Sequence, residues 1–165
     1  MDVARRGFLR GRFRQVANVP RPPWALPHGA FEAACTRCDD CVKACPTRVI
    51  AKGDGGYPTL DFHQGECTFC GDCVTACKPA ALVREADAAP WSLKAVISEG
   101  CIARQGVECR ICGENCEMSA IRFRPTLGGI STPQLDDNVC TGCGACVAPC
   151  PVGAVSAVLP METEQ

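Results

Sequence analysis

The most informative part of the sequence is Cys35-Thr-Arg-Cys38-Asp-Asp-Cys41-Val-Lys-Ala-Cys45-Pro46. Its spacing, C-x2-C-x2-C-x3-C, recurs at 67–77 and 140–150, and a variant with seven residues after its first cysteine occupies 101–116. About one residue in ten is cysteine, which indicates that something other than a large hydrophobic core holds the chain together. The four runs use all 16 cysteines of the 165-residue chain: Cys35, Cys38, Cys41, Cys45, Cys67, Cys70, Cys73, Cys77, Cys101, Cys109, Cys112, Cys116, Cys140, Cys143, Cys146 and Cys150.

The spacing is typical of ligands for a cubic [4Fe-4S] cluster. Three cysteines at three-residue intervals can hold three iron corners of one cube, and the fourth ligates the other cluster of a pair, as in two-cluster bacterial ferredoxins. Pairing the first two runs predicts site A from Cys35, Cys38, Cys41 and Cys77, and site B from Cys67, Cys70, Cys73 and Cys45. Pairing the last two predicts site C from Cys101, Cys109, Cys112 and Cys150, and site D from Cys140, Cys143, Cys146 and Cys116.

Two other uses of cysteine compete with this interpretation. A secreted disulfide scaffold also has an even number of cysteines, but such scaffolds do not repeat one four-cysteine spacing, and no signal peptide is evident. Zinc sites usually take their ligands from two separated C-x2-C pairs, whereas these runs place more thiols close together. We therefore expect iron–sulfur clusters, with zinc and then disulfides as weaker alternatives.

The cysteine runs form an internal repeat that predicts the domain organisation. We expect a small, loop-rich α+β fold made of two tandem bacterial-ferredoxin-like modules, each with two [4Fe-4S] sites, at 30–84 and 92–160. Residues 1–29 precede them as a basic arm and a strap rich in proline around Trp24. Short alternating stretches predict strands within 57–62, 92–97, 121–124 and 130–135. Because the clusters would form most of the core, metal binding and folding should be coupled.

A pair of apolar residues follows every run, four and five positions after its last cysteine. The pairs are Val49-Ile50, Ala81-Leu82, Ala120-Ile121 and Ala154-Val155. We expect a short helix after each run, with the larger aliphatic residue covering a cluster. Such apolar cover excludes water and helps to set the reduction potential.

Charge is unevenly distributed along the chain. The net charge is −1, but residues 1–30 carry six arginines and a single acid, so the remaining residues hold 11 basic and 17 acidic side chains, a balance of −6. The segment Arg5-Arg6-Gly7-Phe8-Leu9-Arg10 resembles a twin-arginine export signal, but the apolar region that such a signal requires does not follow. We expect a cytoplasmic protein whose arm lies on its own acidic body, on a membrane surface or on a partner. The proline-rich strap is either an extended linker or a Trp24-anchored element that fixes the arm or contacts a partner.

Several function classes find no support in the sequence. No apolar stretch approaches the ~18 residues of a membrane-spanning helix. His28 and His63 lie beside no nucleophile or zinc pattern, and there is no Walker loop and no G-x-G-x-x-G motif after a strand. We find no catalytic acid–base pair, so we expect no enzyme. The net charge of −1 suggests no general attraction to nucleic acid, so we expect no nucleic-acid partner. Electron transfer and protein recognition remain.

The chain resembles the NapF family, the ferredoxin-type accessory proteins of the periplasmic nitrate reductase system. Beyond the cysteine runs, the resemblance rests on Arg5-Arg-Gly-Phe-Leu-Arg-Gly-Arg-Phe-Arg14, Arg21-Pro-Pro-Trp24, Gly55-Gly-Tyr-Pro58, Val107-Glu-Cys-Arg110 and Phe123-Arg-Pro-Thr-Leu127. It implies a cytoplasmic iron–sulfur protein that binds the molybdenum-containing catalytic subunit before export and assists its maturation, by protein binding and by electron or cluster delivery.

The same resemblance implies clusters at the three regular runs. The run at 101–116 departs from the family pattern by its seven-residue gap and by Glu117 in place of proline, so a fourth cluster there stays open. The alternative function is an electron-relay polyferredoxin subunit of a redox complex, which would not need the arm. The residues expected to contact the partner are Arg5, Arg6, Arg10, Arg12, Arg14 and Trp24.

Overall fold

The computed structural model describes residues 19–125 and 129–160. In this part of the chain no helix or strand is longer than five residues. The elements are α2 (Ala30–Ala34), α3 (Asp40–Ala44), β1 (Ile50–Lys52), the 3-10 turn η1 (Asp54–Gly56), β2 (Pro58–Leu60), α4 (Asp72–Ala76), β3 (Lys94–Ile97), α5 (Ile111–Glu114), β4 (Ile121–Pro125), β5 (Ser131–Leu135) and β6 (Val155–Val158). The expected small, loop-rich α+β fold is confirmed.

The strands pair into three separate antiparallel ladders. β1 pairs with β2, β3 with β6, and β4 with β5. The β3–β6 pair joins residues about 60 positions apart, with Ile97 opposite Val155, and so brings together the two ends of the second cysteine-rich region. All four stretches predicted to contain strands do so, as β2, β3, β4 and β5.

The prediction of a short helix after each cysteine run is wrong. The third residue after the last cysteine has a left-handed backbone, with φ between 52° and 60°, and its N–H donates to the carbonyl of that cysteine at 2.8–3.3 Å. The four residues are Arg48, Ala80, Ser119 and Gly153. A left-handed residue interrupts a right-handed helix, so the chain turns sharply and three of the four apolar pairs lead into β1, β4 and β6. Three helices lie inside the runs instead. These are α3, α4 and α5, and each contains the third cysteine of its run.

The apolar pairs that follow these turns form much of the core. All eight of their residues are at most 5% exposed, as expected for positions that cover a buried site. They are Val49, Ile50, Ala81, Leu82, Ala120, Ile121, Ala154 and Val155.

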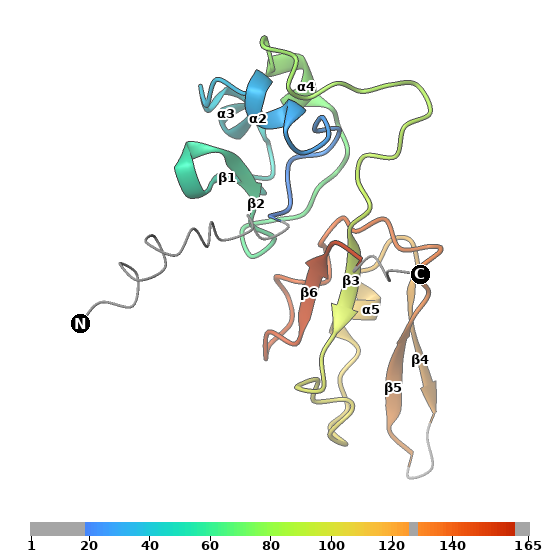
Figure 1. Cartoon of the computed structure of the whole chain (residues 1–165). Coiled ribbons are helices and arrows are strands. Elements are labelled where there is room, and N and C mark those ends of the chain that lie inside the picture. The colour runs from blue at the N-terminus through green and yellow to red at the C-terminus, as the bar shows by residue number, and fades with distance from the viewer. Residues whose placement is uncertain (1–18, 126–128, 161–165) are drawn as a thin grey trace, which may run out of the picture.

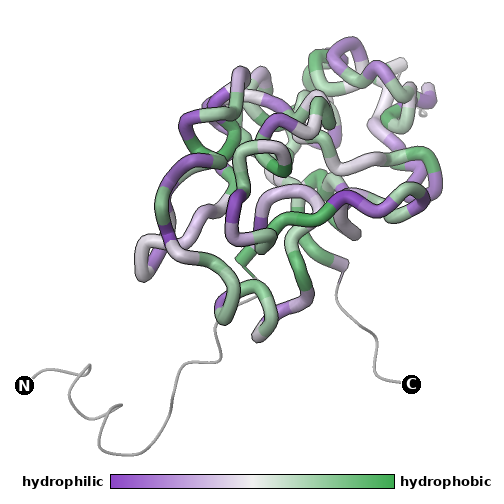
Figure 2. Tube along the Cα trace, turned by 90° about the horizontal axis from the view of Figure 1, so that it is seen from above, coloured by the Kyte–Doolittle hydropathy of each residue, from purple (hydrophilic) through white to green (hydrophobic). Residues whose placement is uncertain are grey.

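The elements form two groups (Figure 1). α2, α3, α4 and the β1–β2 hairpin lie in one group, and the β3–β6 pair, α5 and the β4–β5 hairpin lie in the other, with the chain after α4 running between them. Hydrophobic and hydrophilic residues alternate over short stretches along the trace (Figure 2). Among the described residues, no helix has the length and apolar character needed to cross a membrane.

The strap is anchored to the connection between the two groups. The Trp24 N–H donates to the Pro90 carbonyl at 2.7 Å, and its indole N–H donates to the Ala88 carbonyl at 3.3 Å. The Arg84 guanidinium lies 4.7 Å from the centre of the Trp24 ring. These contacts favour a fixed strap over a free linker, and they leave Trp24 only 7% exposed, with little surface for the partner contact expected of it. The five arm arginines, Arg5, Arg6, Arg10, Arg12 and Arg14, lie outside the described residues.

Candidate metal centres

The three regular cysteine runs share one loop conformation. In each run, the second and fourth residues after the first cysteine have a positive φ, between 55° and 88°. The pairs are Arg37 and Asp39, Phe69 and Gly71, and Gly142 and Gly144. In the first two runs, the fourth residue after the first cysteine is the N-cap of a helix. Asp39 caps α3 and Gly71 caps α4. This shared loop directs the first three cysteines of each run toward one cavity.

The four cysteines predicted to form site A come from two different runs and line one cavity. Cys35, Cys38 and Cys41 line this cavity together with Cys77, which comes from the end of the second run. Phe31, Pro58 and Leu82 supply its apolar wall.

Site B has the same arrangement, but here the first run supplies the fourth cysteine to a cavity of the second run. Cys67, Cys70 and Cys73 share a cavity with Cys45, and the wall includes Val49 and Ile50. Burial acts to raise the pKa of Cys45, but hydrogen bonds from the Thr47 hydroxyl and from the backbone of Thr47, Val49 and Ile50 outweigh it, so the pKa is lowered.

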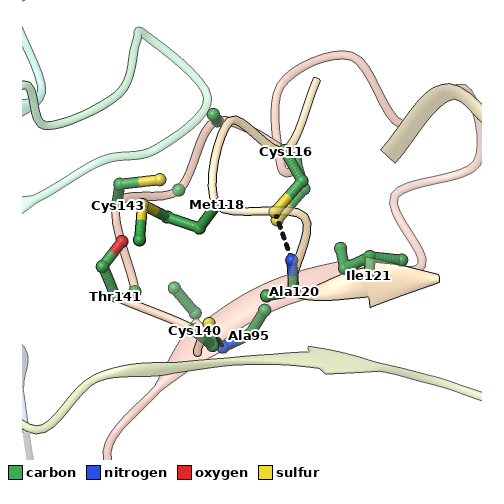
Figure 3. Close-up of a pocket in the computed structure, with 13 residues that line it drawn as sticks. Ala95, Cys116, Met118, Ala120, Ile121, Cys140, Thr141 and Cys143 are labelled. Carbon is green, nitrogen blue, oxygen red and sulfur yellow. Dashed lines mark hydrogen bonds between the residues drawn. The ribbon is translucent and has the colours of Figure 1, made fainter. Parts of the chain in front are cut away.

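Site D is the same arrangement in the second group (Figure 3). Cys140, Cys143, Cys146 and Cys116 line one cavity. The Ala120 N–H donates to the Cys116 sulfur at 3.3 Å, and the Ala95 N–H of β3 donates to the Cys140 sulfur at 3.4 Å. Met118 extends along this cavity toward Cys143, a lining residue that the sequence pattern did not single out.

Site C is built differently because the third run lacks the shared loop. The second and fourth residues after Cys101, which are Ala103 and Gln105, do not have a positive φ, whereas Gly106 does, at 88°. The seven-residue gap instead folds into a turn in which the Arg104 and Gln105 N–H groups donate to the Cys101 carbonyl at 3.0 and 3.2 Å. Cys101 and Cys112 are both 8% exposed, and the Cys112 thiol interacts electrostatically with Cys101 and Cys109.

The fourth predicted ligand of site C, Cys150, ends the fourth run. Its sulfur accepts a hydrogen bond from the Ala154 N–H at 3.2 Å, the same contact that Cys116 makes with Ala120. The structure thus brings three of the four predicted site C thiols together and gives Cys150 the local geometry of a fourth-position cysteine.

The third cysteine of every run is held as a neutral thiol. Burial, helped by neighbouring cysteines, raises the pKa of Cys41 and Cys112 to about 11 and that of Cys73 and Cys146 to about 12. Cys67 has a pKa of about 11, chiefly from burial. Binding iron requires thiolates, so filling these sites must release protons from the thiols. The iron must also supply positive charge, because burial disfavours the negative charge of the thiolates.

The arrangement fits a four-iron cluster better than a single metal ion. A [4Fe-4S] cluster takes four thiolates, and each of the three cavities offers four cysteine thiols, from two runs, behind apolar cover. Within residues 19–125 and 129–160, no three His, Cys, Asp or Glu side chains are grouped so as to hold one ion.

Comparison with known proteins agrees with this geometry. Residues 34–82 and 106–154 each match the 4Fe-4S dicluster domain. The chain is 47% identical over 157 residues to the ferredoxin-type protein NapF of Escherichia coli strain K12, covering 95% of both chains. It is 44% identical over 165 residues to NapF of Haemophilus influenzae, covering 94% of this chain and 93% of that one. The chain belongs to the NapF family of ferredoxin-type proteins.

The NapF family assignment confirms the sequence-based identification. A more distant similarity, 32% identity over 175 residues, links the chain to the methylamine utilization ferredoxin-type protein MauM of Methylophilus methylotrophus, covering 95% of this chain and 77% of that one. The expected non-enzymatic, tandem iron–sulfur protein is also confirmed. The ligand roles of individual cysteines and the module boundaries at 30–84 and 92–160 stay predictions.

Proposed function

We propose that this NapF-family chain is a cytoplasmic iron–sulfur protein that assists maturation of the molybdenum-containing catalytic subunit of the periplasmic nitrate reductase before export. The observation that carries the proposal is the similarity to NapF proteins over 94–95% of the chain. The four-thiol cavities support it, because they are suited to [4Fe-4S] clusters, which accept or donate one electron at a time. The chain would bind the immature subunit and deliver electrons or a cluster to it.

The basic arm is the proposed contact with that subunit. Each oxidised cluster with four thiolates carries about −2, so four clusters would shift the balance of residues 31–165 from −6 to roughly −14. The contrast between the arm and the body therefore grows when the sites are filled. Because charge contacts are screened over ~8–10 Å at physiological salt, binding through the arm should weaken as salt rises.

An anaerobic pull-down with the unexported catalytic subunit tests this role. The double variant R5A/R6A should bind the subunit less well than the native chain while keeping its iron, because Arg6 precedes the first predicted ligand, Cys35, by 29 residues. The matched control is R122A/R124A, which removes two exposed arginines from β4 and should leave binding unchanged. Unchanged binding by R5A/R6A would contradict the role proposed for the arm.

A second candidate function, an electron-relay subunit of a redox complex, is favoured by a specific observation. Cysteines of neighbouring sites interact electrostatically: Cys73 with Cys41, Cys67 with Cys143, and Cys146 with Cys112. A relay needs such neighbouring centres but does not need residues 1–18. Full activity of an arm-deleted chain in its redox complex would favour the relay over the maturation factor.

A further inference from the structure

The cysteine loops of the two modules are joined directly. The Cys67 N–H, in the second run, donates to the Cys143 carbonyl, in the fourth run, at 2.8 Å. The two residues are candidate ligands of site B and site D, and their thiols interact electrostatically. The junction therefore lies between two candidate metal centres rather than at a distance from them.

An aromatic cluster packs around this junction. The Trp91 ring meets Phe69 edge-on at 5.5 Å between ring centres and Phe62 nearly perpendicularly at 6.1 Å. Its indole N–H donates to the Thr141 carbonyl at 2.8 Å. Edge-to-face pairs of this kind contribute about 0.5–1.5 kcal/mol each beyond the area they bury. Trp91 thus ties residues of the first module to the fourth cysteine run.

Gly144 completes the junction on the side of site D. Its φ of 84° favours glycine, and a Cβ at this position would collide with the Phe62 ring, which is 6% exposed. The absence of a side chain lets the fourth cysteine run approach the first module this closely. The Phe62 ring can therefore pack against residue 144 only because that residue has no side chain.

The contacts between thiols give the order of the four sites along the molecule. The thiol interactions place site A beside site B through Cys41 and Cys73, and site D beside site C through Cys146 and Cys112. Both of these contacts lie within a module, whereas the contact between Cys67 and Cys143 crosses from one module to the other. The order along the molecule is A, B, D, C.

We propose that Trp91, Phe62 and Gly144 are positioning residues that clamp the two modules so that sites B and D stay adjacent and the four sites form one electron path. The proposal rests on the iron–sulfur sites of the proposed function but not on any partner. Across the junction, a reduced cluster held at site B by Cys67 would give one electron to an oxidised cluster held at site D by Cys143. No proton, bond or further reactant is involved.

Trp91 is the best residue with which to separate clamping from cluster binding. It lies outside both dicluster matches, 34–82 and 106–154. Trp91→Leu removes the edge-to-face contacts and the hydrogen bond, whereas Trp91→Phe keeps a ring against Phe62 and Phe69. Both variants should retain native iron and sulfide.

The test uses the full-length, anaerobically reconstituted chain and two measurements. Small-angle X-ray scattering should show a larger radius of gyration for Trp91→Leu than for the native chain. The electron paramagnetic resonance spectrum of the fully reduced protein should lose the part of its spin–spin broadening that arises between sites B and D. Trp91→Phe should restore most of both properties.

Glycine substitutions supply a matched pair. Gly144→Ala and Gly129→Ala place alanine at nearly the same backbone angle, φ 84° and 87°, but nothing lies within 4 Å of a Cβ at Gly129. Gly144→Ala should change the spectrum as Trp91→Leu does, and Gly129→Ala should not. At native iron content, unchanged scattering or an unchanged spectrum in Trp91→Leu would overturn the proposal. Iron loss in Trp91→Leu would also overturn it, because the tryptophan would then be needed to hold a cluster.

Discussion

At the scale of single residues, hydrogen bonds to sulfur distinguish otherwise equivalent cysteines. Backbone N–H groups donate to Cys116 and Cys150, the last cysteines of their runs, at 3.3 and 3.2 Å. Cys45, the last cysteine of the first run, also lies 3.5 Å from the Thr47 hydroxyl oxygen. Donors to cluster sulfurs stabilise the more negative, reduced state and raise the potential. Site B should therefore depend on a side chain as well as on backbone donors.

Thr47→Val tests this dependence, because valine keeps the shape of threonine and removes its hydroxyl. A neutral hydrogen bond contributes about 0.5–1.5 kcal/mol, which for a one-electron couple corresponds to roughly 20–60 mV. We expect a redox titration followed by electron paramagnetic resonance to show one centre shifted to a more negative potential by about that amount. Thr75→Val is the control, since the Thr75 hydroxyl donates to the Gly71 carbonyl and not to sulfur. Equal potentials in Thr47→Val and the native chain would contradict the prediction.

Thr47→Val should also change the thiol chemistry of the cluster-free chain. The threonine hydroxyl is the largest of the contributions that lower the pKa of Cys45, whereas burial raises the pKa of Cys73 to about 12. The thiolate is the reactive form, so iodoacetamide should modify Cys45 before Cys73 at pH 8, and Thr47→Val should slow the reaction at Cys45. Mass spectrometry of the alkylated peptides measures both rates. Equal rates at the two cysteines would show that the cluster-free chain does not keep this geometry.

At the scale of elements, the sequence pattern predicted the strands and the loops better than the turns that join them. The strands at 58–60 and 131–135 lie in alternating stretches bounded by glycine or proline, which carry a local signal. Three of the four left-handed residues after the runs do not, because arginine, alanine and serine have no preference for a positive φ; only Gly153 carries such a signal. Their conformation follows from the placement of the last cysteine at a cavity of the other run. The contacts of Trp91 likewise join residues distant in sequence, so no local pattern predicts them.

These turns store strain that glycine should relieve. Ala80 is exposed with a φ of 55°, a conformation that costs a residue with a Cβ about 1–2 kcal/mol. Glycine's greater freedom in the unfolded chain offsets roughly 0.5–1 kcal/mol of the gain. Ala80→Gly should therefore stabilise the cluster-loaded protein by about 0.5–1 kcal/mol and raise its melting temperature by roughly 1–4 °C.

The control for this substitution is Ala33→Gly, at an exposed position inside α2. There the same change should lower the melting temperature, because glycine destabilises a helix by about 0.5–1 kcal/mol relative to alanine. Thermal unfolding followed by circular dichroism under anaerobic conditions distinguishes the two signs. A lower melting temperature in both variants would show that Ala80 is not strained.

The exchange of ligands between runs is the second element-scale prediction. Cys45 lines the cavity of Cys67, Cys70 and Cys73 rather than that of its own run. Cys45→Ser should therefore alter the spectrum of site B and leave site A intact, while Cys35→Ser should do the reverse. Electron paramagnetic resonance of the reduced variants identifies which centre is lost. A defect at site A in Cys45→Ser would show that each run holds its own cluster.

At the scale of the whole molecule, the sequence leaves open how many clusters the chain holds. The third run has neither the regular spacing nor the two left-handed loop residues of the other runs. Its longer gap folds back on itself, however, and buries Cys101 and Cys112 together, with Ala103 only 2% exposed beside them. By folding back, the gap brings Cys101 close to Cys112, which is what the regular loop does for the cysteines of the other runs. We therefore expect site C to be filled.

Filling all four sites should give about sixteen iron and sixteen sulfide per chain after anaerobic reconstitution. The double variant C109S/C112S should lose about four iron, and the lost centre should be the one that couples to site D, because the Cys112 thiol interacts electrostatically with Cys146. Metal analysis and the spectrum of the reduced protein measure these two outcomes. Exposed Val107, in the same loop, supplies a control: Val107→Ala should keep native iron. About twelve iron in the native chain, unchanged in C109S/C112S, would show that the third run holds no cluster and that its cysteines are structural.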